Sequence, residues 1–187
     1  MKKCILVTGG ARSGKSRFAL ELAKKSAQPV LFVATAVAGD EEMKQRIENH
    51  RKERPADWRT LEVTTDVGTH IRKAIGDARV FIIDCIALLV NNVLSKHGYG
   101  VSPEADAIAE QQVNDEINRL VECIKTKDAT FIIVTNEVGL GIVPADKTTR
   151  LYRDLLGRAN QMLASCADEV YFMVAGLPVK VKPSEKG

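Results

Sequence analysis

The sequence predicts an α/β fold in which a mostly parallel sheet is flanked by helices. Apolar runs with the length of buried strands alternate with helix-prone segments, which is the pattern of a parallel sheet with helical crossovers. The first apolar run leads into a glycine-rich sequence of the kind that binds phosphates. No linker or low-complexity stretch divides the 187 residues, so we expect one domain spanning 1–187.

The first half of the chain is expected to alternate strand and helix. Its apolar runs are short and continuous, and the segments between them are amphipathic or polar, with apolar residues recurring at helical spacing after the glycine-rich sequence. The expected strands are residues 4–8, 30–35, 60–63 and 80–84, and the expected helices lie around 18–23, 40–53 and 67–75.

The second half adds longer helices and closes with a hairpin. Val113, Ile117 and Leu120 form one apolar stripe of a long helix, and a glycine-rich loop at 97–103 precedes it. Only Ala175-Gly176 separates the last two apolar runs, which predicts a short antiparallel pair at a sheet edge. The expected helices are 85–96, 104–125 and 147–165, and the expected strands are 130–135, 169–174 and 177–181.

The glycine-rich sequence is a complete phosphate-binding loop of the form G-x-x-x-x-G-K-S. Its glycines let backbone N–H groups point at phosphates, and the following helix contributes the positive end of its dipole. We expect Lys15 to reach the β- and γ-phosphates and Ser16 to bind a bridging Mg²⁺. The strand and helix on either side favour this function over an ordinary glycine-rich turn. The expected nucleotide contacts are Gly9, Gly10, Ala11, Arg12, Ser13, Gly14, Lys15 and Ser16.

Asp84 ends the strongest apolar run of the chain. A phosphate-loop protein needs a carboxylate at such a strand end to complete the Mg²⁺ shell. An aspartate there can also be a simple strand-end or helix N-cap residue. Because a phosphate loop lies upstream, we favour the metal role for Asp84, together with Ser16.

A histidine and several arginines share the helix expected at 40–53. Arg46 and His50 are one turn apart on one face, and Arg54 is close to that face where Pro55 should stop the helix. An imidazole that is mostly neutral near pH 7 can attack a nucleotide phosphorus and hold it through a P–N bond, with guanidinium groups on the phosphate oxygens. From spacing alone, a solvated helix face is the commoner explanation.

A third polar group follows the strand expected at 130–135. Asn136 and Glu137 lie at the sheet edge where open α/β folds keep their ligands, so Glu137 is a candidate to orient a substrate hydroxyl or a water. Arg150 and Arg153 on the next helix are candidates to meet phosphates. The alternative is a surface helix face on which Asp154 is their partner.

Composition excludes several other classes. Cys4, Cys85, Cys123 and Cys166 are widely spaced and make no C-x-x-C pair, which favours buried thiols in a reducing cytoplasm. The net charge of +3 comes from basic residues interspersed with acids, so we expect no nucleic-acid partner. We also expect no signal peptide and no membrane span, because the first strand follows Met1-Lys2-Lys3 directly and every apolar run is short.

These residues resemble the bifunctional adenosylcobinamide kinase/adenosylcobinamide-phosphate guanylyltransferase family of cobalamin nucleotide-loop assembly. The resemblance covers nearly the whole chain, and the order of its motifs is more specific than any one of them. The blocks that carry it are Val7–Ser16, Arg46-Ile47 with His50-Arg51 and Arg54-Pro55, Trp58–Thr60 with Glu62, Asp84-Cys85 with Asn92, Thr135–Pro144, Arg153–Gln161 and Ala175–Lys180.

The resemblance implies two reactions: phosphorylation of the aminopropanol hydroxyl of adenosylcobinamide, then transfer of GMP from GTP to the new phosphate. The family's guanylylated histidine falls on His50, and its nucleotide-binding positions fall on Arg46, Arg51, Arg54 and Glu62. The resemblance also implies a RecA-like phosphate-loop fold and a homotrimer with sites between subunits.

One departure from the family pattern and two alternative functions stay open. Glutamate is an alternative in the family at the position of Asp84, and the shorter Asp84 should still reach Mg²⁺, either directly or through water. The alternatives to the two-step enzyme are a plain phosphate-loop kinase, in which His50 is a bystander, and a nucleotide-dependent binding switch, against which the missing Asn-Lys-x-Asp signature argues. A phosphate loop contacts the phosphates of a nucleotide and not its base, so both ATP and GTP are candidates for the kinase step.

Overall fold

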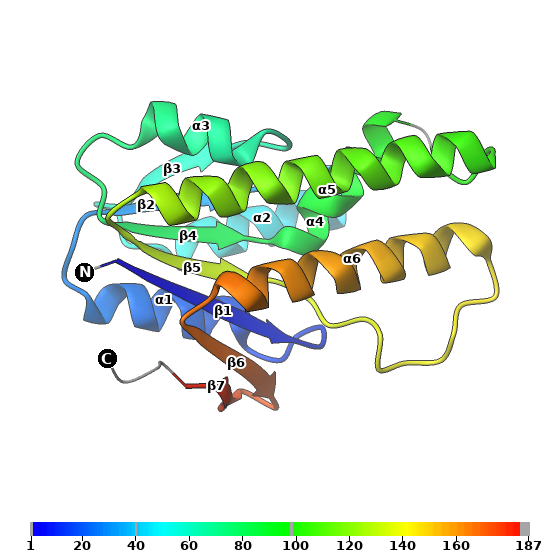
Figure 1. The fold of residues 1–187 in the computed structure, drawn as a ribbon. Helices are drawn as coiled ribbons and strands as arrows, with labels where there is room; N and C mark the ends of the chain where they lie inside the picture. The colour runs from blue at the N-terminus through cyan, green and yellow to red at the C-terminus, as the bar shows by residue number, and fades with distance from the viewer. Residues whose placement is uncertain (1, 40, 98, 184–187) are drawn as a thin grey trace.

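The structure is a computed structural model, and it describes residues 2–39, 41–97 and 99–183 (Figure 1). Strands and helices alternate in the order that the sequence predicts. The strands are β1 (Lys3–Gly9), β2 (Val30–Ala34), β3 (Arg59–Glu62), β4 (Val80–Asp84), β5 (Thr130–Val134), β6 (Glu169–Val174) and β7 (Leu177–Lys182). The helices are α1 (Lys15–Lys25), α2 (Glu41–Lys52), α3 (Val67–Ala74), α4 (Ile86–His97), α5 (Pro103–Thr126) and α6 (Lys147–Cys166).

The strands form one sheet in the order β3-β2-β4-β5-β1-β6-β7. Every pair is parallel except β6 with β7, which are antiparallel and joined by the turn at Ala175-Gly176. The predicted phosphate-loop fold, with its mostly parallel sheet and edge hairpin, is therefore confirmed. Each element lies within a few residues of its expected range; Asp40, expected to begin a helix, falls outside the described residues.

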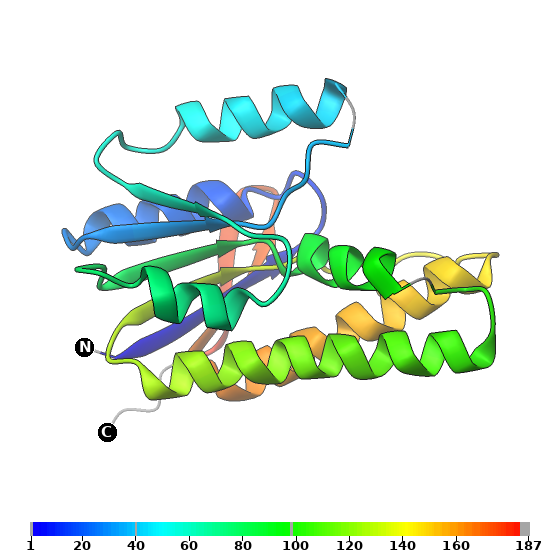
Figure 2. The same cartoon turned by 90° about the horizontal axis from the view of Figure 1, so that it is seen from above.

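Helices cover both faces of the sheet. Helices α3, α5 and α6 lie on one face, and α1 lies against the other (Figure 1). Figure 2 shows α2 apart from the α5–α6 layer, with strands of the sheet between them. Because both faces are covered, β2, β4 and β5 carry apolar residues on both sides, which is why these strands read as continuous apolar runs in the sequence.

The core lies between these layers. Phe81 on β4 and Phe131 on β5 are in register and fully buried, and their rings stack with centroids 4.8 Å apart. Ile117 and Leu120, on the predicted apolar stripe of α5, are also fully buried. Among the described residues, no helix combines the length and apolar character that crossing a membrane requires.

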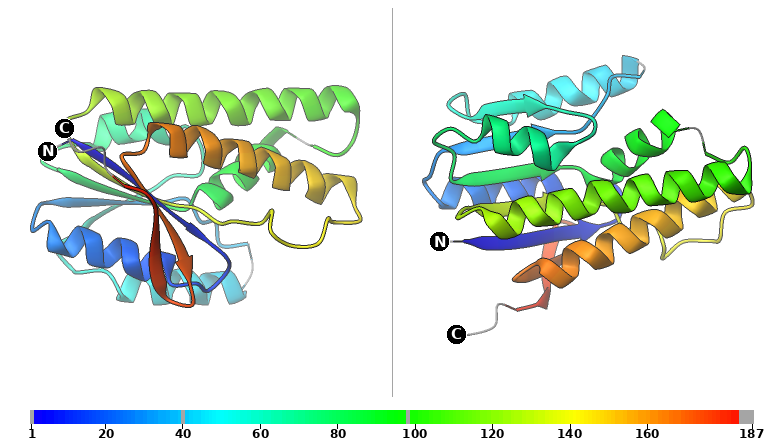
Figure 3. Two further views of the ribbon diagram at one scale, coloured as in Figure 1. Left: turned by 60° about the horizontal axis from the view of Figure 1, so that its bottom comes forward. Right: turned by 45° about the horizontal axis from the view of Figure 1, so that its top comes forward.

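The β6–β7 hairpin, at the edge of the sheet opposite β3, is much more exposed than the core. Figure 3 shows β6 and β7 as a narrow pair projecting from the strands of the sheet. The side chains of Leu177, Val179 and Val181 are 70%, 51% and 63% exposed, although all three are apolar.

Candidate functional site

The predicted site residues gather at the carboxyl edge of the parallel sheet. Glu62 pairs with Ala34, Ala34 with Asp84, Asp84 with Val134, and Val134 with Val7. This row of partners places Glu62, Asp84 and the start of the phosphate loop at one end of the sheet, although they are far apart in the sequence. Ligands of open α/β folds bind at this edge.

The phosphate loop is closely packed, and two of its glycines are required by geometry. Gly9 has φ +148°, and a Cβ there would lie 2.7 Å from the carbonyl oxygen of Met173. Gly14 has φ +92°, and a Cβ there would lie 3.2 Å from the Cα of Gly176. The Gly176 N–H donates to the Ser13 carbonyl at 3.0 Å. The turn of the β6–β7 hairpin therefore supports the phosphate loop, and side chains at Gly9 or Gly14 would push the two apart.

Lys15 points into the loop rather than into solvent. The residue is 7% exposed, and its Nζ donates to the Gly10 carbonyl at 2.5 Å. The ammonium is also close enough to β4 that its charge acts on the Cys85 thiol, whose pKa burial nevertheless raises to about 12. A cation is thus held by the backbone of the phosphate loop itself. Ser13 Oγ is buried close by and has no hydrogen-bond partner among the described residues.

A second group of site residues forms an open cavity of about 360 Å³ beyond β3. Arg51 and Glu62 form an ion pair across it. Its lining combines cationic, aromatic and carboxylate side chains, the types that contact phosphates and a base. The lining residues are Arg51, Arg54, Pro55, Ala56, Trp58, Thr60 and Glu62.

Arg54 takes a different position from the one that helical spacing suggests. Helix α2 ends at Lys52, so Arg54 does not extend the face of His50. Its guanidinium instead lies 3.6 Å from the centroid of the Phe32 ring. Burial lowers the pKa of Arg54, and the nearby charge of Asp84 opposes that effect. The structure thereby brings Arg54 toward the carboxylate that ends β4.

His50 lies in the last turn of α2, immediately before the cavity residue Arg51, and is half-buried. The side chain of Arg46 lies outside the described part of the chain, although its backbone belongs to α2. His50 is not itself part of the cavity lining, so the structure places it next to a lining residue along the chain, and its role there stays a prediction.

Asn136 and Glu137 follow β5 at the sheet edge and lie beside the phosphate loop. The Glu137 N–H donates to the Gly9 carbonyl at 3.0 Å, and the Glu137 carboxylate accepts the Gly139 N–H. Asn160 on α6 fixes this segment, because its Nδ2 donates to the Asn136 carbonyl at 3.0 Å. Its Oδ1 accepts the hydroxyl of the fully buried Thr135 at 2.7 Å.

The two arginines of α6 have partners within the chain. Arg150 donates to the carbonyls of Pro144 and Ala145, at 2.8 and 2.6 Å. Arg153 pairs with Asp154 at 3.1 Å. These contacts favour the structural role for both residues, although Arg153 also lines an open cavity beside Gly139.

No structural role was predicted for the two threonines that hold the strand ends together. Thr35 and Thr135 each follow a buried strand and are themselves fully buried. A buried hydroxyl needs partners, and these threonines bind Cys85 and Asn160. A threonine directly after an apolar strand is the signal that points to them, whereas nothing in the sequence indicates their partners.

The comparisons with known proteins cover nearly the whole chain. Residues 5–181 match the family described as cobinamide kinase / cobinamide phosphate guanyltransferase. The bifunctional adenosylcobalamin biosynthesis protein CobU of Escherichia coli is 45% identical over 180 residues, which are 95% of this chain and 99% of that protein. CobU of Salmonella typhimurium is 43% identical over 180 residues, with the same coverage of each chain. CobP of Pseudomonas aeruginosa is 40% identical over 177 residues, 95% of this chain and 96% of the relative.

Proposed function

The chain belongs to the cobinamide kinase / cobinamide phosphate guanyltransferase family, and on that premise we propose that it catalyses both reactions. The first phosphorylates the aminopropanol hydroxyl of adenosylcobinamide with ATP or GTP. The second transfers GMP from GTP to that phosphate, giving adenosylcobinamide-GDP and pyrophosphate. One observation carries the proposal: the phosphate loop, Asp84 and Glu62 share one sheet edge, with His50 on the adjoining helix.

In the kinase step, the substrate hydroxyl attacks the γ-phosphorus and the bond to the β–γ bridging oxygen breaks. Lys15 neutralises charge on the phosphates, and Glu137 accepts the hydroxyl proton after releasing the Gly139 N–H. The hydroxyl of Ser16 and the carboxylate of Asp84 are oxygen ligands of the type that Mg²⁺ prefers. When bound there, Mg²⁺ would neutralise charge on the transferring phosphate.

In the guanylyl step, a His50 ring nitrogen attacks the α-phosphorus of GTP and pyrophosphate leaves. A phosphate oxygen of adenosylcobinamide phosphate then attacks the same phosphorus, the P–N bond breaks, and His50 is regenerated. Arg51 and Arg54 supply guanidinium groups at the adjoining cavity, and we assign the same role to Arg46. The covalent intermediate avoids a direct approach of two polyanions.

We further propose that the enzyme is a cytoplasmic homotrimer with sites between subunits. Support comes from exposed apolar side chains near the carboxyl edge of the sheet: Leu140, Ile142 and Val143 are 80%, 97% and 62% exposed. Apolar residues grouped on a surface favour contact with another protein surface. Three reduced cysteines buried in the fold fit a reducing compartment.

The experiment that tests the function is intact-protein mass spectrometry after incubation with GTP and Mg²⁺. We expect a mass increase of one GMP that is lost in acid and is absent from His50→Asn. His70→Asn is the matched control, since His70 lies on α3 with its Nδ1 at 2.9 Å from the Asp66 carbonyl, and it should still form the adduct. Absence of an adduct in wild-type protein that binds GTP would favour a plain kinase.

A further inference from the structure

Asn92 joins the ends of two strands at the candidate site. The residue lies on α4, and its Nδ2 donates to the carbonyl of Thr35 at 2.8 Å and to the carbonyl of Thr64 at 3.1 Å. An asparagine amide has two N–H donors, so the side chain commits both of them to the backbone. Thr35 directly follows β2, and Thr64 comes two residues after Glu62 at the end of β3. Asn92 therefore ties these two strand ends together.

Thr35 extends this connection to the end of β4. Its hydroxyl donates to the Cys85 carbonyl and accepts the Cys85 N–H, both at 2.8 Å. Its own N–H donates to the Asp84 carbonyl at 3.1 Å. A continuous path of hydrogen bonds thus runs from Thr64 through Asn92 and Thr35 to the residues at the end of β4.

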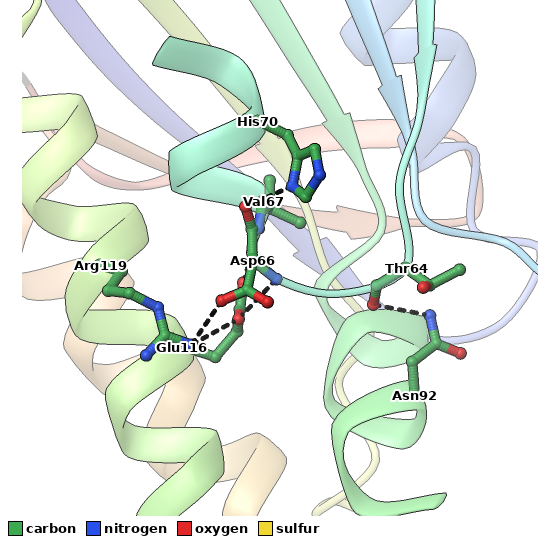
Figure 4. Close-up of polar contacts among 7 residues, drawn as sticks. All are labelled: Thr64, Asp66, Val67, His70, Asn92, Glu116 and Arg119. Carbon is green, nitrogen blue, oxygen red and sulfur yellow. Dashed lines mark hydrogen bonds and ion pairs between the residues drawn. The ribbon is translucent and has the colours of Figure 1, made fainter. Parts of the chain in front are cut away.

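The segment after Glu62 is held from its other end by α5. Glu116 is 1% exposed, and its carboxylate accepts the N–H groups of Asp66 at 2.8 Å and of Val67 at 2.9 Å. Arg119 pairs with both Glu116 and Asp66, at 2.9 and 3.2 Å. Figure 4 shows the two attachments on one stretch of chain, with Asn92 at Thr64 and the α5 side chains at Asp66.

These attachments matter because β3 is an edge strand. It has four residues, and among the described residues it pairs with β2 alone, so that no described strand fixes its outer side. The Glu62 side chain at its end is 57% exposed and pairs with Arg51, which is 52% exposed. An ion pair this exposed does little to hold a strand in place. The position of Glu62 relative to Asp84 is therefore set by the β2–β3 and β2–β4 ladders on one side and by contacts from outside the sheet on the other.

We propose that Asn92 is a positioning residue for guanylyl transfer, which holds the Glu62 end of β3 at a set distance from the Asp84 end of β4. This inference rests on the proposed function, because it assigns Glu62 to the nucleotide in the guanylyl step. The kinase step depends less on Asn92, since Thr35 stays tied to β4 through its own hydroxyl and through the β2–β4 ladder.

The test compares Asn92→Ala and Asn92→Asp with Asn91→Ala, a change at the exposed neighbouring residue. The rate of guanylylation of His50 is measured against GTP concentration, and kinase activity is measured separately on adenosylcobinamide. We expect Asn92→Ala to lose about tenfold in kcat/KM for guanylylation, mainly through a higher KM for GTP. A tenfold loss is what the removal of one or two neutral hydrogen bonds would cause. Asn92→Asp should lose more, because its carboxylate has no donor and faces two carbonyl oxygens.

Urea unfolding establishes that the compared variants are folded, and Asn92→Ser, which keeps one donor, serves as a milder change. Retention of wild-type guanylylation kinetics in Asn92→Ala and Asn92→Asp would overturn the inference. An equal loss in both reactions, with KM unchanged, would also overturn it, because that result indicates a general structural role. A wild-type protein that forms no GMP adduct would instead contradict the proposed function itself.

Discussion

Both proposed reactions require Lys15, because both need the triphosphate held in the phosphate loop, and the residue is buried there. The loop folds around the ammonium, which donates to the Gly10 carbonyl while lying close to β4. A phosphate that enters the loop meets a positive charge already in position. Electrostatic stabilisation in phosphoryl transfer depends on such preorganised charge.

Lys15→Ala should therefore abolish both activities, with losses of at least about 100-fold, the usual cost of removing one such electrostatic group. Steady-state assays of kinase and guanylyl transfer, together with GTP binding by calorimetry, check this expectation. Lys25→Ala, at the exposed end of the same helix, is the control and should keep both activities. Retention of either activity in Lys15→Ala would mean that a second nucleotide site exists.

At the scale of elements, α3 begins in an unusual way. Its N-cap residue Asp66 has φ +55° and makes no capping hydrogen bond with its own side chain. The carboxylate of Glu116 on α5 caps the helix instead, and its charge is favourable beside the positive end of the helix. This buried carboxylate therefore joins α3 to α5 as well as satisfying two backbone donors.

Glu116→Gln should lower the free energy of unfolding by about 1–3 kcal/mol. The amide keeps the size of the side chain but presents a donor to one of the two backbone N–H groups and leaves Arg119 without its buried partner. Urea unfolding measures the change. Glu122→Gln is the matched control on the same helix, because its 67% exposed carboxylate pairs with Arg72 at the surface and should cost less than about 1 kcal/mol. Equal losses in the two variants would contradict the capping role.

At the scale of the whole molecule, the carboxyl edge of the sheet carries both the candidate site and the exposed apolar loop of Leu140, Ile142 and Val143. A subunit that docks on this loop would also approach the nucleotide. The oligomeric state and the activity are therefore expected to be coupled.

Sedimentation velocity should give a species of three times the 20.5 kDa chain mass. Ile142→Asp should shift this species toward monomer and reduce guanylyl transfer, because burial of a charge at an apolar contact is unfavourable. Val181→Asp, at the end of the hairpin away from its turn, is the control and should leave the trimer intact. A monomeric wild-type protein, or a trimer that only Val181→Asp disrupts, would refute this arrangement.

Much of the fold follows from local patterns in the sequence. Strands β2, β4 and β5 are continuous apolar runs because they are covered on both faces, and the stripe on α5 has helical spacing because one face of that helix is buried. The phosphate loop could also be identified from the sequence, because all of its residues are contiguous. These features depend on neighbours within a few positions, so the sequence alone was sufficient to determine them.

Tertiary structure decided which distant groups meet. Arg54 turns to Phe32 rather than continuing the face of His50, because α2 ends first and an aromatic face on β2 is within reach. Asn92 contacts the backbone of Thr35, Glu116 caps the start of α3 from α5, and Asn160 holds Asn136. These partners are brought together by sheet order and helix packing, and their backbone acceptors and donors are present in nearly every residue type. The identities of these residues therefore do not indicate which backbone groups their side chains contact. Only the folded structure shows these contacts.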